Sequence, residues 1–194
     1  MSGRVSASAV LGAITGALLL SGCSDQGSAG RDAGSGEPRA ETLAALVSRA
    51  DDLSVVSATL EDAGLAQVFD GTAAYTMLAP RDAAFESLGE TGELLRSAEQ
   101  RPAMVAVLRD HIVPGYLTPD DIAKAIELDS DGKVSMKTMA GHTLTFARTG
   151  DTISATGEDG ASARFAGDAL RASNGVAIPV DGIAVDIGGG AAPR

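Results

Sequence analysis

Residues 75–85, with the sequence Tyr-Thr-Met-Leu-Ala-Pro-Arg-Asp-Ala-Ala-Phe, decide the fold of this chain. The apolar run Tyr75–Ala79 is short and ends at Pro80, which is typical of a strand. Asp82 then stands near the start of a new apolar pattern that reaches Leu88, and this placement predicts a helix. The stretch therefore predicts a strand that leads directly into a helix.

Helical spacing of apolar residues recurs on both sides of this stretch. Before it, the spacing predicts two short amphipathic helices, at residues 43–47 and 53–65, with Gly64 placed as a stop. After it, helices are predicted at residues 102–108, with a proline in the first turn, and at residues 119–128. The first half of the chain is thus predicted to be mainly helical.

Beyond Gly132 the spacing changes to alternation of apolar and polar residues, interrupted by glycines. This pattern predicts short strands joined by glycine turns, at residues 134–136, 143–146, 152–154 and 163–165. Helices followed by antiparallel strands are typical of the α+β class, in contrast to an alternating βαβ arrangement.

Composition limits the partners of the chain. Its 194 residues suit one domain plus appendages. The 26 acidic and 15 basic side chains give a net charge of -11. Affinity for phosphate backbones comes largely from clustered lysine and arginine, so this charge argues against nucleic acid as a partner.

The N-terminus is predicted to be a signal peptide over residues 1–22. It carries one charge, Arg4, and the apolar run Ala7–Leu20 is shorter than the roughly 20 residues that a spanning helix needs. The run leads into Leu20-Ser-Gly-Cys23, which resembles the bacterial lipoprotein box, in which cleavage before the cysteine leaves a lipid on its thiol. An alternative is a plain secretory signal cleaved nearby, with Cys23 an incidental thiol.

The predicted domain organisation follows from this leader. Residues 23–38 are predicted to be the lipidated N-terminus and a flexible Gly, Ser and Asp linker, because they lack bulky apolar side chains. Residues 39–187 form the predicted folded domain, and the glycine-rich residues 188–194 a disordered tail. The protein is expected to be exported and held by Cys23 on the cell membrane or the outer membrane, facing the periplasm or the cell surface.

Three segments, in order, resemble the fasciclin domain family. Residues 75–85 are similar to its first signature, residues 108–115 (Leu-Arg-Asp-His-Ile-Val-Pro-Gly) to its central histidine segment, and residues 174–182 (Asn-Gly-Val-Ala-Ile-Pro-Val-Asp-Gly) to its terminal signature. Residues 138–146 also look like the strand pair between the second and third segments. The resemblance spans residues 41–187, essentially the whole predicted domain.

The resemblance implies a fold and a class of function. It implies helices packed on an antiparallel sheet wedge or sandwich, and a binding role in adhesion or in extracellular matrix or envelope interaction, with an unknown protein or glycan as partner. At two positions the chain differs from the family pattern: Asp110 stands where many members have tyrosine, and Ile178 where many have histidine. The tyrosine–histidine segment is the part of the family most often linked to adhesion.

The candidate motif or interaction residues come from these segments. They are Thr76, Phe85, His111, Ile112, Val113, Asn174 and Asp181. Phe85, Ile112 and Val113 are core candidates before they are interface candidates. In the fasciclin pattern His111 follows a helix and begins a strand, so its ring is expected to bond to backbone more readily than to act as a base.

Four further expectations concern turns and single residues of the same domain. Asn174-Gly175 and Asp181-Gly182 fit two-residue hairpin turns, in which both central residues need positive φ. Pro179 predicts an edge strand or a local bend, and His142, after Gly141, is expected to be solvated.

No motif in the chain predicts catalysis. The segment Asp129-Ser-Asp131-Gly132 lacks the rest of a calcium loop and is better explained as a plain turn. No G-x-S-x-G or phosphate-binding glycine motif is found in a fitting context, so we expect no enzyme activity, metal or cofactor. The alternative is an envelope hydrolase or small-ligand carrier that uses a pocket near His111.

Overall fold

The computed structural model describes residues 41–187, which lie within one compact unit of the chain. The predictions for the leader, Cys23, the linker and the tail fall outside these residues. None of the helices in the described part is long and apolar enough to cross a membrane.

The described residues form seven α-helices, one 3-10 turn and eight strands, which confirms the α+β class. The helices are α1 (Leu43–Val47), α2 (Ser54–Asp62), α3 (Ala66–Phe69), α4 (Asp82–Glu86), α5 (Glu90–Leu95), α6 (Arg101–Asp110) and α7 (Pro119–Leu128), with the turn η1 at Ala98–Gln100. The strands are β1 (Tyr75–Pro80), β2 (Ile112–Pro114), β3 (Lys133–Lys137), β4 (Thr143–Thr149), β5 (Thr152–Thr156), β6 (Ser162–Arg164), β7 (Leu170–Ala172) and β8 (Gly175–Val180).

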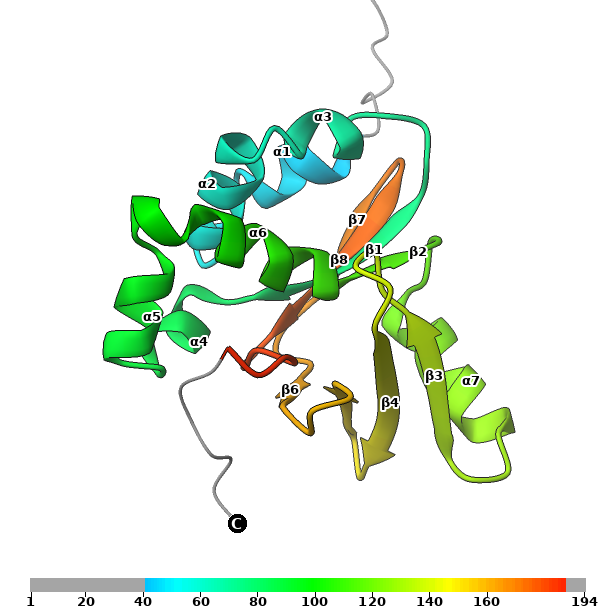
Figure 1. The fold of residues 1–194 in the computed structure, drawn as a ribbon. Helices are drawn as coiled ribbons and strands as arrows, with labels where there is room; N and C mark the ends of the chain where they lie inside the picture. The colour runs from blue at the N-terminus through cyan, green and yellow to red at the C-terminus, as the bar shows by residue number, and fades with distance from the viewer. Residues whose placement is uncertain (1–40, 188–194) are drawn as a thin grey trace, which may run out of the picture. The chain divides into compact units, whose positions relative to one another are not determined.

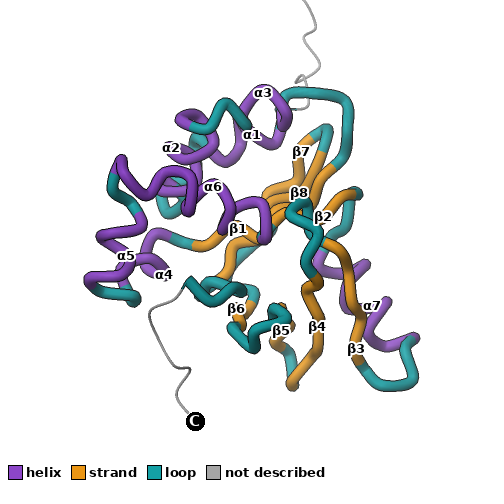
Figure 2. Tube along the Cα trace, viewed as in Figure 1, coloured by secondary structure: helices purple, strands orange, loops and turns teal. Residues whose placement is uncertain are grey.

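The strands form two four-stranded sheets, with the orders β2-β1-β8-β7 and β3-β4-β5-β6 (Figures 1 and 2). The second sheet is an antiparallel meander made by the predicted alternating segments. In the first sheet, β2 and β7 pair antiparallel with their neighbours, while the central strands β1 and β8 run parallel. This parallel pair joins the first and the terminal signature residue by residue, from Tyr75 opposite Gly175 to Pro80 opposite Val180.

The β1–β8 pair separates two apolar cores, because alternate residues of a strand point to opposite faces. Met77 and Ala177 belong to the helix-side core, which they share with apolar residues of α1, α2, α4 and α6. Leu78 and Ile178 belong to the sheet-side core, which they share with Phe146 of β4 and with residues of β5 and α7. Figure 1 shows the corresponding layers, with α1–α6 gathered on one side of β1 and β8, and β3–β6 with α7 on the other.

Several helix starts are fixed by side chains that the sequence places beside them. Thr118 and Asp121 form a reciprocal capping box at the start of α7, where Pro119 occupies the first turn. Asp82 opens α4 and also accepts hydrogen bonds from the backbone N–H groups of Ser54 and Val55, at 3.2 and 2.9 Å. The carboxylate of Asp82 therefore caps α2 from outside and ties the first signature to the N-terminal helices.

The predicted turn at Asn174-Gly175 is wrong. The loop between β7 and β8 consists of Ser173 and Asn174, because Ala172 pairs with Gly175. Gly175 lies inside β8 and has no positive φ. A Cβ placed on it would lie 2.4 Å from the carbonyl oxygen of Tyr75, so the glycine is required by the close approach of two strands.

The expectation of an edge strand at Pro179 and that of a hairpin turn at Asp181-Gly182 are also corrected. Strand β8 is an inner strand and the last of the chain's described strands, and no hairpin follows at Asp181-Gly182. Strand β7 pairs with β8 only as far as Ala177. Beyond it, Phe165 bridges Val180, and the carbonyl of Pro179 accepts from the N–H of Ala166 at 2.8 Å, so the proline lies where regular ladder pairing on that side has given way to an isolated bridge. Gly182 has no positive φ, and a Cβ there would lie 3.0 Å from the carbonyl oxygen of Ser162.

We predict that Gly175→Ala destabilises the domain by about 3 kcal/mol, because a methyl group cannot fit against β1 without separating the strands. Gly132→Ala is the control, since its position has φ +64° and open space around the added Cβ. That control is expected to cost about 1 kcal/mol from backbone strain alone. Urea unfolding followed by far-ultraviolet circular dichroism measures the free energy of unfolding of both variants. Equal losses of this free energy in the two variants would contradict the packing argument.

Candidate functional site

His111 is the C-cap residue of α6, within the central segment 108–115, and is fully buried. Its ring Nδ1 lies 2.8 Å from the carbonyl oxygen of Val107, and the N–H of Ala184 donates to Nε2 at 2.9 Å. Its own carbonyl accepts from the N–H of Leu78 at 2.8 Å. The expectation that the ring bonds to backbone is therefore confirmed.

These contacts define the proton state of the ring. The amide of Ala184 can only donate, so Nε2 is unprotonated and the ring hydrogen lies on Nδ1, which donates to Val107. Burial lowers the pKa of His111, and this effect outweighs the hydrogen bond to Val107 and the charge of Asp110, which both raise it. The imidazole is a neutral structural link with both nitrogens occupied.

A second histidine lies beside it at the surface. The carboxylate of Asp110 is almost fully buried, and its Oδ1 accepts from Thr138 at 3.2 Å and from Nδ1 of His142 at 2.7 Å. The His142 side chain is 64% exposed, which confirms the expectation of a solvated ring. The sequence does not predict its hydrogen bond to Asp110. Asp110 thus fixes the orientation of an exposed imidazole.

Two clefts flank the Asp110–His142 pair, and both are lined by these two residues together with Asp159 and Val185. The larger, of about 390 Å³, runs between the helices α5 and α6 and the segment 185–187. Its wall is mainly apolar and includes Leu94, whose surface is 60% exposed. The smaller, of about 200 Å³, lies between the turn 138–144 and the turn 157–159.

The chemistry available here is hydrogen bonding and apolar contact. The carboxylate of Asp110 accepts from the hydroxyl of Thr138, and in the described part of the chain no hydroxyl or thiol is hydrogen-bonded to the ring of His142. A nucleophile activated by a base requires such a contact. Within residues 41–187, no three His, Cys, Asp or Glu side chains lie together as metal ligands.

The other candidate residues of the first two segments lie inside the domain. Phe85 and Ile112 are buried in the helix-side core and Val113 in the sheet-side core, so they are core residues as expected. The hydroxyl of Thr76 donates to the carbonyl of Gly115 and accepts from the N–H of Leu117, both at 2.8 Å. These four side chains have almost no surface to offer a partner.

Asn174 does more than turn the chain. Its buried side chain accepts from the N–H of Leu43 at 2.8 Å and donates to the carbonyls of Phe69 and Gly71. It therefore fastens the start of α1 and the end of α3 to the β7–β8 hairpin.

Asp181 is the one exposed residue of the candidate set. It accepts from the backbone N–H and from Nε of Arg164, at 2.8 and 2.9 Å, and so ties the end of β8 to β6.

We predict that His111→Ala lowers the free energy of unfolding by about 2–4 kcal/mol, because it leaves a cavity and two unpaired buried backbone groups. His142→Ala removes the other histidine and is expected to cost less than about 1 kcal/mol, as for other exposed pairs. Thermal and urea unfolding of both variants provides the test. A His111→Ala variant as stable as the wild type would contradict the structural role.

We also predict that acid destabilises the domain through His111. In the unfolded chain its pKa returns to about 6.5, while burial keeps the folded value lower, so only the unfolded state gains this proton. The contribution of His111 to the free energy of unfolding is therefore complete above about pH 6.5. It is lost as the pH falls below this value, by at most about 1.4 kcal/mol per pH unit. Urea unfolding of wild type and His111→Gln from pH 7.5 to 5 measures it, and parallel profiles would contradict the prediction.

Comparison with known proteins agrees with this geometry. The model of the fasciclin domain matches residues 51–185. None of the curated proteins compared with the chain matches it. Among solved structures, the FAS1 domain pair of the insect cell adhesion molecule Fasciclin I is similar, with a TM-score of 0.56 and 21% sequence identity.

The structural match covers 68% of this chain and 44% of the insect chain, so this chain spans less than half the length of that relative. At 21% sequence identity, this structural similarity shows only that the two chains share a fold. The family model matches more than half of the 194 residues and includes both strands of the central parallel pair. The chain therefore belongs to the fasciclin domain family.

Proposed function

We propose that this protein is an exported, lipid-anchored binding protein that acts in adhesion or in matrix or envelope interaction through its fasciclin domain. The observation that carries the proposal is the family membership of the domain, since the similar solved structure comes from a cell adhesion molecule. The partner would be a protein or a glycan, and binding would take place outside the cytoplasm.

The sequence before the domain supports the anchor. Leu20-Ser-Gly-Cys23 follows an apolar run that is too short to span a bilayer, and Cys23 is the only cysteine of the chain. A thiol with two or more acyl chains would hold the protein stably on a membrane, because each buried methylene contributes about 0.8 kcal/mol.

The interior of the domain supports binding over catalysis. His111 has both ring nitrogens bonded to backbone and no exposed surface, so it cannot reach a substrate. The cleft of about 390 Å³ beside Asp110 and His142 instead offers an apolar wall with an exposed leucine, Leu94. Apolar surface rimmed by polar groups is typical of a contact site for another molecule.

A hydrolase or ligand carrier that uses His111 is the alternative from a different class of function. It requires an accessible imidazole, and the burial of His111 gives it no support. A protein that hydrolyses ester or peptide substrates at a rate removed by His111→Ala, with its melting temperature retained, would favour this alternative.

We predict that Cys23→Ser moves the protein from the membrane fraction to the soluble fraction of the producing bacterium and lowers the attachment of cells to a matrix-coated surface. The cause is the loss of the acylated thiol, while the domain is unchanged. Immunoblots of the fractions and counts of attached cells give the two readouts.

The two readouts separate the parts of the proposal. The control is Ser24→Ala, because this variant changes the residue next to Cys23 and keeps the thiol. Unchanged fractionation of Cys23→Ser would contradict the anchor. A released protein with undiminished cell attachment would contradict the adhesive role and leave the anchor in place.

A further inference from the structure

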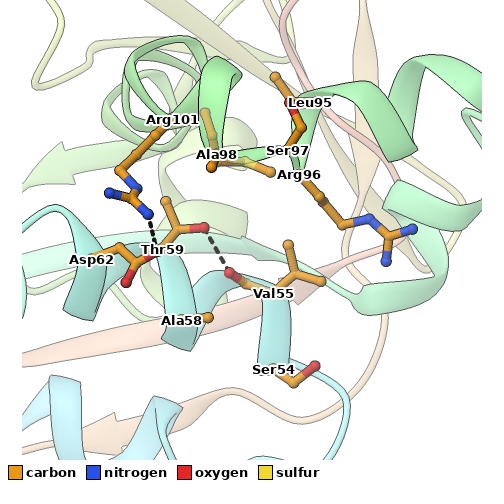
Figure 3. Close-up of a pocket in the computed structure, with 11 residues that line it drawn as sticks. Ser54, Val55, Ala58, Thr59, Asp62, Leu95, Arg96, Ser97, Ala98 and Arg101 are labelled. Atoms are coloured by element: carbon orange, nitrogen blue, oxygen red, sulfur yellow. Dashed lines mark hydrogen bonds and ion pairs between the residues drawn. The ribbon is translucent and has the colours of Figure 1, made fainter.

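A third cleft lies on the helical side of the domain, away from the Asp110–His142 pair. It has a volume of about 340 Å³ and lies between α2 and the segment that joins α5 to α6 (Figure 3). Its apolar lining consists of Val55, Ala58, Leu95, Ala98 and Met104. This volume is at the lower end of the range of about 300–1,000 Å³ that is typical of small-molecule sites.

Two arginines line the same cleft. Arg101 pairs with Asp62 at 3.3 Å, and both side chains are more than half exposed. Arg96 donates from Nε to the carbonyl of Gly92 at 3.3 Å, and no carboxylate of the described residues lies within ion-pair distance of it. Figure 3 shows Arg101 reaching toward Asp62, while Arg96 extends on the other side with no labelled acid beside it.

This lack of a partner is informative because the chain is acidic, with 26 acidic and 15 basic side chains. Within residues 41–187, six of the eight arginines pair with carboxylates, for example Arg81 with Asp52. The two that do not are Arg96 and Arg109, and of these only Arg96 lines the cleft. The guanidinium of Arg96 is thus a positive charge without a carboxylate partner at the edge of an apolar cleft, with N–H donors left for a planar anion.

A buried hydroxyl adds a second polar group. Thr59 and Ser97 both line the cleft, and the hydroxyl of Thr59 is satisfied, since it donates to the carbonyl of Val55 at 2.7 Å. The hydroxyl of Ser97 is buried and has no hydrogen-bond partner in the described part of the chain. An unpaired buried hydroxyl is costly, and rotation about one side-chain bond can turn it toward an acceptor in the cleft.

We propose that this cleft binds a monocarboxylate with a short to medium aliphatic chain. The carboxylate pairs with Arg96 and accepts from Ser97, and the aliphatic chain packs on Val55, Leu95 and Met104. A multiply charged anion fits less well, because Asp62 and the net charge of -11 oppose it. This site goes beyond the proposed adhesive function and does not depend on it.

The test is calorimetric titration of octanoate into the full chain that carries Cys23→Ser, which has no thiol to acylate. We expect saturable binding with one site per chain, and much weaker binding of 1-octanol, which has the same chain length without the charge. Arg96→Gln is expected to lower the affinity about tenfold. Arg109→Gln is the matched control, because it removes the same charge from an exposed position on α6 that does not line the cleft.

Two further variants test the lining. Ser97→Ala is expected to weaken octanoate binding severalfold without lowering the melting temperature, because the hydroxyl has no partner to lose in the free protein. Asp62→Asn is expected to strengthen binding, because it removes a negative charge and frees Arg101.

Three outcomes would overturn the proposal. The first is the absence of saturable octanoate binding. The second is equal affinity for octanoate and 1-octanol, which would remove the role of the charge. The third is an equal loss of octanoate affinity in Arg96→Gln and Arg109→Gln. This result would show that octanoate is attracted by the overall charge and not by a specific site.

Discussion

The parallel pairing of β1 with β8 is the contact on which the rest of the structure depends. These two strands supply alternate side chains to both apolar cores, so neither core can form without them. Every residue of β8 is buried, which accounts for an almost uninterrupted apolar sequence in the terminal signature. Their close approach at Gly175 leaves no room for a side chain, and the glycine of this signature is explained by the spacing of two backbones.

The elements that the sequence predicts well are those whose pattern is local. The helix at α7 is predicted with its observed bounds because Pro119 marks its start and apolar residues follow at helical spacing. The strands β3–β6 are predicted because alternation and glycine turns depend only on neighbouring residues. The short helices α3 and α5 carry too few residues to show a period and were not predicted.

The errors concern residues whose role is set by distant parts of the chain. An Asn-Gly pair is a strong hairpin signal, yet here Asn174 bonds to α1 and α3, and Gly175 faces Tyr75. The pair of Asp110 and His142 is separated by 32 residues, and no local pattern indicates it. The two departures from the family pattern have structural explanations as well: Asp110 holds His142 and Thr138, and Ile178 fills the sheet-side core.

The order of the strands has a consequence for how the newly made protein folds. Strand β1 has its central partner about a hundred positions later in the chain, in the last strand that the structure describes. On the ribosome, the sheet therefore cannot close until translation has passed β8, and the long separation slows the search for the correct register. The first sheet and both apolar cores therefore stay incomplete until β8 has been made, whereas the meander β3–β6 pairs only neighbouring strands and can form before it.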